Sequence, residues 1–382
     1  MRGMVDVFLT KDELELREEY RELVRREVAP FVEEIDEKDV VPRALVEKLV
    51  KPPFSLTALS IPPEFGGLGH GAVKVGLVAE ELGHACPALI PFLEIAQLYG
   101  HVIVKGGSAE QKERFLTRLA NGEIGCYALT DEGPGSDPAS MTTVAKPASD
   151  GYELSGLKRI ITFADMADLF AIFAKREDVD DPVESISAFV VEKGTPGLKL
   201  ESHCRAVGLR GHRAYNVRLE GVRVPRENLI EKAGLRLALS VLNTTRVSLA
   251  FGFVGLARAA YEAAVKFAGE RVVRGRPISQ RQAISFPIAE LATQIDAARL
   301  LALRAARMEE AGLRHRKETS MAKYYAGDVL LKAVDLAARV HGGFAGDEEY
   351  PVQRFLRDAY TWVAAQGTTE VQKLVVAREI FG

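Results

Sequence analysis

The 382-residue sequence predicts a mainly helical protein with a central β domain: an N-terminal helical domain, a middle β-sheet domain and a C-terminal four-helix bundle. Apolar residues recur with helical spacing at both ends of the chain, while short β-rich runs separated by Gly, Pro and Asp turns fill the middle. Apolar residues at 47% and charged residues at 27% are ordinary for a globular protein, which excludes disordered and fibrous classes. The predicted domains are 1–122, 123–226 and 227–382.

The N-terminal domain carries several helix start and stop signals. Thr10 and Glu13 have the spacing of a capping box, and Pro30 should end or bend the helix that they begin. Pro42 should begin a short helix and Ser108 should cap another. Two further helices are predicted over Val73–Gly83 and Pro87–Val104.

The middle domain is predicted from runs rich in β-branched and aromatic residues, each bounded by turn residues. These runs are Tyr152–Leu154, Leu169–Ala174, Ile186–Val191 and Ala214–Leu219. Their number and short spacing indicate one small β-sheet of about 100 residues.

Long helical patterns follow Pro225, and their short links predict an antiparallel bundle. The patterns cover Leu235–Ala268, Ser279–Ala311, Thr319–Val340 and Thr368–Ile380. The first of them is apolar enough to be considered as a membrane span. Arg246 near its middle would be costly in lipid, so we expect a buried core helix.

Composition limits the partners and cofactors. With 50 basic and 53 acidic residues the net charge is −3, which favours neither a nucleic acid nor a membrane surface as partner. The three cysteines and seven histidines are scattered without metal-ligand spacing, so no metal is expected. The N-terminus lacks the apolar run of a signal peptide, so we expect a cytoplasmic location.

Two motifs point to chemistry. Thr130 to Asp137 reads Thr-Asp-Glu-Gly-Pro-Gly-Ser-Asp after a β-rich run, and such a loop can offer backbone N–H groups and the Ser136 hydroxyl to a phosphate or a flavin edge. An ordinary tight turn is the alternative. The second motif runs from Arg357-Asp358 through Gly367-Thr368 to Arg378-Glu379. Its alternative reading is a terminal helix with Thr368 as N-cap.

In this order and with this α–β–α pattern, the motifs resemble those of the acyl-CoA dehydrogenase family over essentially the whole chain. His341-Gly-Gly343 and Glu349-Tyr-Pro-Val352 add further matches. The resemblance implies an oxidoreductase of CH–CH bonds with FAD as cofactor and a CoA thioester as substrate. It also implies a homotetramer in which one subunit completes its neighbour's flavin site, and electron-transferring flavoprotein as the electron acceptor.

The resemblance implies three groups of site residues, and an exposed helix charge is the alternative for each arginine among them. The positions facing the subunit's own FAD are Tyr127, Leu129, Thr130, Gly135, Ser136, Ile160, Thr162, Thr368 and Glu370. The positions reaching a neighbouring subunit's FAD are Arg271, Ile278, Gln282, Arg339, Gly342 and Gly343. The substrate positions are Ser136, Thr245, Arg246, Ala365 and Gly367.

The chain departs from the family at the general base. The family usually has Tyr-Glu-Gly-Thr where this chain has Ala365-Gln366-Gly367-Thr368, and an amide cannot accept the substrate's proton. Some members place the base on the helix of Arg246, at the position of Thr245 here, and a hydroxyl does not serve either. Ile160, Phe163, Arg274 and Arg339 also replace the usual Trp, Asn, Phe and Gln.

Glu94 is the candidate for a relocated base. It falls on the helix that lines the acyl pocket in the family, and its apolar neighbours should raise the pKa of its carboxyl group. The alternative is a carboxylate that only shapes the pocket floor.

The resulting hypothesis is FAD-dependent oxidation of a cyclic or branched acyl-CoA, with space left by Ala365; the chain resembles the cyclohexene-carbonyl-CoA dehydrogenases. Three alternatives stay open. One is desulfinase-like elimination, for which Lys105 is the only cation near the pocket helix. Another is a non-catalytic subunit of a hetero-oligomer. The last is an engineered Glu-to-Gln variant of an ordinary acyl-CoA dehydrogenase.

Overall fold

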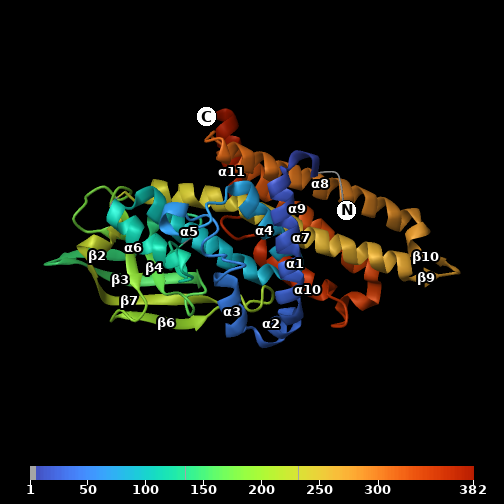
Figure 1. The fold of residues 1–382 in the computed structure, drawn as a ribbon, viewed down its shortest axis with the longest axis horizontal. Coiled ribbons are helices and arrows are strands. Elements are labelled where there is room, and N and C mark those ends of the chain that lie inside the picture. Colours follow the sequence, from blue (N-terminus) through green and yellow to red (C-terminus); the bar gives the residue numbers. More distant parts are fainter. Residues whose placement is uncertain (1–5, 134, 231) are drawn as a thin grey trace.

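The computed structural model describes residues 6–133, 135–230 and 232–382. Strands gather at one end of an elongated molecule, and the long helices extend from them to the other end (Figure 1). This arrangement confirms the predicted mainly helical fold with a central β-sheet.

The N-terminal part is helical, as predicted. Thr10 and Glu13 form the expected capping box, with the Thr10 backbone N–H donating to Glu13 Oε2 at 2.8 Å. Ser108 caps a later helix in the same way, paired with Gln111. The helices are α1 (Lys11–Glu27), α2 (Val32–Lys38), α3 (Arg43–Val50), α4 (Ala72–Ala85), α5 (Ile90–Gly106) and α6 (Ala109–Ala120).

The sheet has eight strands in the order β6-β7-β3-β2-β4-β5-β8, with β1 pairing in parallel to β4. Its strands are β1 (Gly125–Ala128), β2 (Val144–Ala148), β3 (Gly151–Thr162), β4 (Leu169–Arg176), β5 (Ile186–Glu192), β6 (Leu198–His203), β7 (Ala214–Pro225) and β8 (Leu229–Ile230). The predicted β-rich runs were shorter than β3 and β7, and they missed β2, β6 and β8. The edge strand β6 has no buried residue, so it lacks the apolar pattern that predicts a strand.

The C-terminal part is a bundle, as predicted, and its apolar first helix lies in the core. Its elements are α7 (Leu235–Glu270), the hairpin β9 (Val272–Val273) and β10 (Arg276–Pro277), α8 (Gln282–Glu310), α9 (Arg316–His341), α10 (Val352–Trp362) and α11 (Thr369–Phe381). Thr368 is the N-cap of α11, because its hydroxyl accepts from the Val371 backbone N–H at 3.3 Å. Helix α10 was not predicted.

Within the part of the chain that the structure describes, two helices, α7 and the segment Pro87–Gly106, are long and apolar enough by composition to cross a membrane. In α7, 72% of the most apolar window is buried inside the protein, and in the other segment 89%. Burial to this extent is typical of core helices, as expected for α7.

Helices α4 and α7 cross with their backbones in close contact. A side chain on Gly255 would place its Cβ 2.1 Å from the Glu80 carbonyl oxygen, and one on Gly83 would lie 2.4 Å from that of Gly252. The glycines are therefore required for the crossing. The close approach also brings the acidic residues of α4 against a basic side chain, Arg258, of α7.

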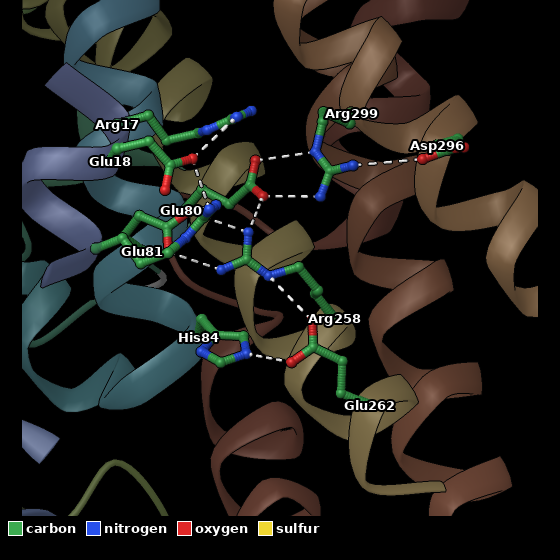
Figure 2. A network of polar contacts seen from close by, with 10 residues as sticks. Arg17, Glu18, Glu80, Glu81, His84, Arg258, Glu262, Asp296 and Arg299 are labelled. Atoms are coloured by element: carbon green, nitrogen blue, oxygen red, sulfur yellow. Dashed lines mark hydrogen bonds and ion pairs between the residues drawn. The ribbon is translucent and has the colours of Figure 1, made fainter. Parts of the chain in front are cut away.

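Figure 2 shows the polar network at this crossing. Arg258 pairs with Glu80 at 2.7 Å and with Glu81 at 2.8 Å, and both carboxylates are 98% buried. Arg299 of α8 bonds Glu80 at 2.8 Å, and Arg21 of α1 bonds Glu81 at 2.9 Å. Four helices are thus joined through two buried carboxylates.

Candidate functional site

Gln366 lies in the loop between α10 and α11, where it is held by two residues of α7. The Thr245 hydroxyl donates to Gln366 Oε1 at 2.7 Å, and Arg246 Nε donates to the Gln366 carbonyl oxygen at 2.9 Å. Gln366 and Gly367 have φ angles of 54° and 102°, so the chain turns sharply here. Helix α7 therefore fixes both the side chain and the backbone at the position of the family's usual base.

Lys323 of α9 holds the same loop from the other side. Its ammonium group donates to the carbonyl oxygens of Val363 and Gly367, both at 2.7 Å. Gln372 Nε2 adds weaker bonds to the Gln366 and Gly367 carbonyls, at 3.4 and 3.3 Å. Burial lowers the pKa of Lys323 to about 8.

The sequence interpretation missed Lys323, although the pattern contained a signal. Lys323 falls on the same helical face as Ala322, Ala326 and Gly327, which are all buried. A charged residue within an apolar helical face marks a buried functional or structural contact.

Glu94 of α5 is 94% buried beside Gln366, and its Oε1 has no hydrogen-bond partner among the described residues. Burial raises the pKa of this carboxyl group to about 8, whereas a hydrogen bond from Gln366 and the charge of Lys323 oppose the rise. The expected upward pKa shift is therefore present. The structure brings Glu94, Gln366 and Thr245 together.

A seam of buried polar side chains lies between α5 and α7 next to this group. Ser248 donates to Gln97 Oε1 at 2.9 Å and to the Thr245 carbonyl oxygen at 2.8 Å. Arg246 is largely buried, and burial lowers its pKa to about 10. The alternative of an exposed helix charge is therefore wrong for Arg246.

The Gly-rich loop is anchored at its beginning by Asp131. This carboxylate pairs with the buried Lys158 of β3 at 2.5 Å and accepts from the backbone N–H groups of Thr142 and Thr143 at 2.6 and 2.7 Å. Lys158 also donates to the Leu129 carbonyl oxygen at 3.2 Å. The first residues of the loop are thereby fixed against β3.

The later part of the loop faces outward. Gly135 and Ser136 are exposed, and a Cβ on Gly135 would meet only Thr130 Cγ2, at 3.7 Å. A shallow hollow of about 20 Å³ lies against the loop, lined in part by Leu129, Thr130 and Gly135. Pro134 of this motif lies outside the described residues.

The other positions implied for the chain's own FAD lie around this loop or at α11. The Arg159 backbone N–H donates to the Thr130 carbonyl oxygen at 2.9 Å, which sets Ile160, 60% exposed, beside the loop. Thr162 Oγ1 lies 3.1 Å from His212 Nε2. The Tyr127 hydroxyl instead donates to the Ala238 carbonyl of α7 at 3.1 Å. Thr368 and the exposed Glu370 begin α11.

These residues fit FAD. Exposed glycine backbone and the Ser136 hydroxyl suit phosphate oxygens, and the exposed apolar side chain of Ile160 suits a flavin ring. When bound, FAD would supply a hydride acceptor.

The positions implied for a neighbour's FAD form a separate group at the far end of the bundle. Arg271 lies over the Phe344 ring at 5.3 Å, and Arg339 is exposed and paired with Asp335 at 2.9 Å. Figure 1 shows the β9–β10 hairpin at the end of the molecule opposite to the sheet. Within one chain, the positions implied for its own FAD and those implied for a neighbour's FAD therefore lie apart. The remaining members of the group are Ile278, Gln282, Gly342 and Gly343.

Among the described residues, no group of three or more His, Cys, Asp or Glu side chains is placed to hold a metal ion.

Family models match nearly the entire chain. The N-terminal domain of acyl-CoA dehydrogenase matches residues 10–123, the middle domain 126–222 and the C-terminal domain 232–381. The acyl-CoA dehydrogenase of Bacillus subtilis is 35% identical, over 98% of this chain and 99% of its own length. The acryloyl-CoA reductase (NADH) of Anaerotignum propionicum is also 35% identical, over 98% of this chain and 96% of its own.

Solved structures of acyl-CoA dehydrogenases share the fold of this chain. Butyryl-CoA dehydrogenase from Megasphaera elsdenii superposes with a TM-score of 0.94 at 30% identity, covering 98% of this chain and 99% of that one. A glutaryl-CoA dehydrogenase from Mycobacterium smegmatis, in complex with FADH2, gives a TM-score of 0.93 at 27% identity, covering 99% and 96%. The chain therefore belongs to the acyl-CoA dehydrogenase family of FAD-dependent oxidoreductases.

Proposed function

We propose that the protein oxidises a cyclic or branched acyl-CoA, such as cyclohexene-carbonyl-CoA, with Glu94 as the relocated base. The observation that carries this proposal is the buried Glu94 carboxyl group with one unpartnered oxygen, next to an amide at the usual base position. Burial gives it a pKa of about 8, which suits a group that must accept a proton near neutral pH.

In this proposal each residue has a limited task. Glu94 holds the proton removed from the substrate carbon, and FAD, when bound, would supply the hydride acceptor. Ser136 and Arg246 border the thioester and the CoA moiety, and Gly367 lies beside the reacting carbons. Ala365, in place of a bulky aromatic residue, leaves room for a ring or branch.

The alternatives receive less support. Desulfinase-like elimination needs a free cation near the acyl pocket. Lys105 bonds the Thr244 hydroxyl at 3.5 Å, and Lys323 is engaged by the carbonyl oxygens of Val363 and Gly367. A non-catalytic subunit would not need an anchored Gly-rich loop such as the one held by Asp131 and Lys158. Purification of the protein without yellow colour would favour the non-catalytic reading and contradict ours. An engineered Gln366 is tested by the substrate comparison described next.

Flavin bleaching tests the proposal. The FAD-loaded protein, Glu94→Gln and Gln366→Glu are mixed with straight-chain, cyclohexane-carbonyl- and cyclohexene-carbonyl-CoA. We expect the unmodified protein to bleach with the cyclic substrates only, and Glu94→Gln to lose about 10²–10⁴ in rate. Bleaching by Glu94→Gln at the parent rate excludes Glu94 as base. If only Gln366→Glu oxidises the saturated straight-chain substrate and neither protein oxidises a cyclic substrate, the engineered alternative is favoured.

We further propose a cytoplasmic homotetramer that passes electrons to electron-transferring flavoprotein. The separation of the two groups of FAD positions within one chain supports an assembly in which each subunit completes its neighbour's site. A chain from a structure of the electron transferring flavoprotein of Acidaminococcus fermentans matches with a TM-score of 0.93 at 32% identity, which supports this acceptor.

A further inference from the structure

Two backbone segments with unusual dihedral angles meet where β3 pairs with β7. Strand β3 is irregular near its end, because its pairing with β7 shifts register between Lys158 and Ile161. Ile160 and Phe163 have φ angles of 57° and 50°, and Leu209, in the loop before β7, has a φ angle of 51°. Such angles are unfavourable for residues with side chains and persist where the surroundings impose them, often at functional sites.

Thr162 and His212 join these two segments. Thr162 Oγ1 lies 3.1 Å from His212 Nε2, and the Phe163 backbone N–H donates to the Arg213 carbonyl oxygen at 2.8 Å. Thr162 is also paired with Ala214 across the β3–β7 ladder. A side chain at a position implied for FAD is therefore bonded to a histidine from the neighbouring segment.

The loop that carries His212 is attached to both helical parts of the chain. The Gly211 backbone N–H donates to Oδ1 of Asp39, directly after α2, at 2.8 Å. The Leu209 backbone N–H donates to Asp358 Oδ1 of α10. The backbone on either side of the imidazole is thus held by the protein itself, and the imidazole can orient a neighbour.

The His212 ring is neutral near pH 7. It meets the edge of the Phe163 ring at a centroid distance of 5.6 Å and an angle of 84°, and Phe163 stacks on Phe92 of α5 at 4.0 Å. Burial lowers the pKa of His212 to about 4, although the charge of Asp39 opposes this shift. A neutral imidazole has one donor and one acceptor, so Nε2 can either accept the proton of the Thr162 hydroxyl or donate to its oxygen.

We propose that His212 is a positioning residue for FAD binding: it orients the Thr162 hydroxyl, which then meets FAD as a donor or as an acceptor. The proposal rests on the position of Thr162 at the FAD, and it depends neither on Glu94 nor on the acyl group of the substrate. A partner that can both donate and accept suits a redox cofactor, because a ring atom that gains hydrogen on reduction changes from acceptor to donor.

A double-mutant cycle on FAD affinity tests this role without any substrate. FAD is removed from Thr162→Val, His212→Phe and the double variant, and oxidised FAD is added back while its fluorescence is followed. We expect each single variant to bind FAD about three- to tenfold more weakly, as for the loss of one hydrogen bond. The double variant should bind FAD no more weakly than Thr162→Val alone, since His212 acts through Thr162.

Two further variants separate this role from general support of the loop. His212→Gln should restore most of the affinity, because a glutamine amide can also donate to or accept from the Thr162 hydroxyl. His203→Phe is the matched control: His203 lies at the end of β6, and its ring contacts Tyr215 at 5.5 Å. The flavin absorption maxima should shift in Thr162→Val and His212→Phe, and they should stay at the parent position in His212→Gln and His203→Phe.

Parent affinity for FAD in His212→Phe overturns the positioning role. Additive losses in the double variant also overturn it, because they would mean that the two side chains act separately. Parent affinity in Thr162→Val overturns the proposal as well, since Thr162 would then not contact FAD. All of these measurements remain decisive if Glu94→Gln bleaches at the parent rate and the proposed function of Glu94 as base fails.

Discussion

At the scale of the residue, the neutral side chain at position 366 bears on the charge state of the buried Glu94. Two carboxylates at this buried place would repel, and the pKa of one of them would rise steeply. An amide avoids the repulsion and still offers a donor. In the proposed function, Gln366 therefore leaves Glu94 as the single ionisable carboxyl group at this place, and the positive charge of Lys323 lowers its pKa.

Replacement of Lys323 by Met should loosen the loop that carries Gln366. The change leaves the carbonyls of Val363 and Gly367 without their strong donor, which should lower the free energy of unfolding by about 1–3 kcal/mol. It also removes a positive charge near Glu94, so the pKa of Glu94 should rise above about 8. Urea unfolding and the pH profile of bleaching measure the two effects.

Lys332→Met is the control for this change, because Lys332 is exposed on the same helix. We expect it to alter neither quantity. A Lys323→Met protein with the parent pH profile would show that the ammonium group only supports the loop.

At the scale of the element, the two halves of the Gly-rich loop differ: the first is fixed and the second is exposed. Asp131 accepts hydrogen bonds from Thr142, Thr143 and Lys158, and this fixes the loop's beginning against β3. Gly135 and Ser136 stay exposed for a ligand. In the proposed FAD site, this rigid support beneath an open segment would orient the backbone donors before FAD binds.

Asp131→Asn should therefore weaken FAD binding and also destabilise the protein. The change leaves the Lys158 ammonium group buried without a counter-charge, at a cost of about 3–5 kcal/mol. The double variant with Lys158→Met should regain most of that stability, since no buried charge is left. Glu132→Gln, on the adjacent exposed residue, should leave FAD affinity unchanged. Thermal unfolding and FAD fluorescence titration measure both effects.

The sequence predicted elements with strong local patterns and missed those whose form depends on tertiary contacts. The capping boxes at Thr10 and Ser108 and the long apolar helix α7 were predicted because their signals are local. Strand β6 is an exposed edge strand without an apolar pattern. Glu94 was a candidate because the family resemblance places it on the acyl-pocket helix among apolar neighbours. The helical pattern marked Lys323 as buried, but its partners, like the Asp131–Lys158 pair, needed the fold because they are distant in sequence.

At the scale of the whole molecule, the buried network of Figure 2 joins α1, α4, α7 and α8. Burial alone would raise the pKa of Glu80, but Arg299 and Arg258 hold it at about 2. A carboxyl group with a lowered folded-state pKa stabilises the fold above its unfolded value of 4.5, and this stabilisation is lost as the pH falls toward 2. The helix crossing should therefore weaken in acid.

Arg258→Met tests the network directly. It leaves Glu80 and Glu81 buried with fewer positive partners, so the free energy of unfolding should fall by about 3–5 kcal/mol. Arg25→Met removes an exposed pair with Glu22 on α1 and should change nothing measurable. Equal stability of the two variants in urea would show that the buried pairs contribute no more than the exposed one.

The β9–β10 hairpin next to Arg271 lies at the end of the molecule opposite to the sheet (Figure 1), and this makes the proposed assembly testable by complementation. Gly135→Asp adds a negative charge to the Gly-rich loop where a Cβ has room, and Arg271→Glu reverses a charge at the hairpin end. Each variant alone should bind little FAD. In a symmetric dimer of one chain of each kind, one site carries both defects and the other carries none.

Random pairing of the two variants in co-expression should therefore restore FAD to about one quarter of all sites, measured as flavin absorbance per chain. Mixing the separately purified proteins without subunit exchange is the control and should restore none. FAD content that stays at the level of the single variants after co-expression would mean that each chain builds its site alone. In that case the hairpin of one subunit would not contribute to the FAD site at the Gly-rich loop of another subunit. The distance between hairpin and loop within one chain would then have no role in cofactor binding.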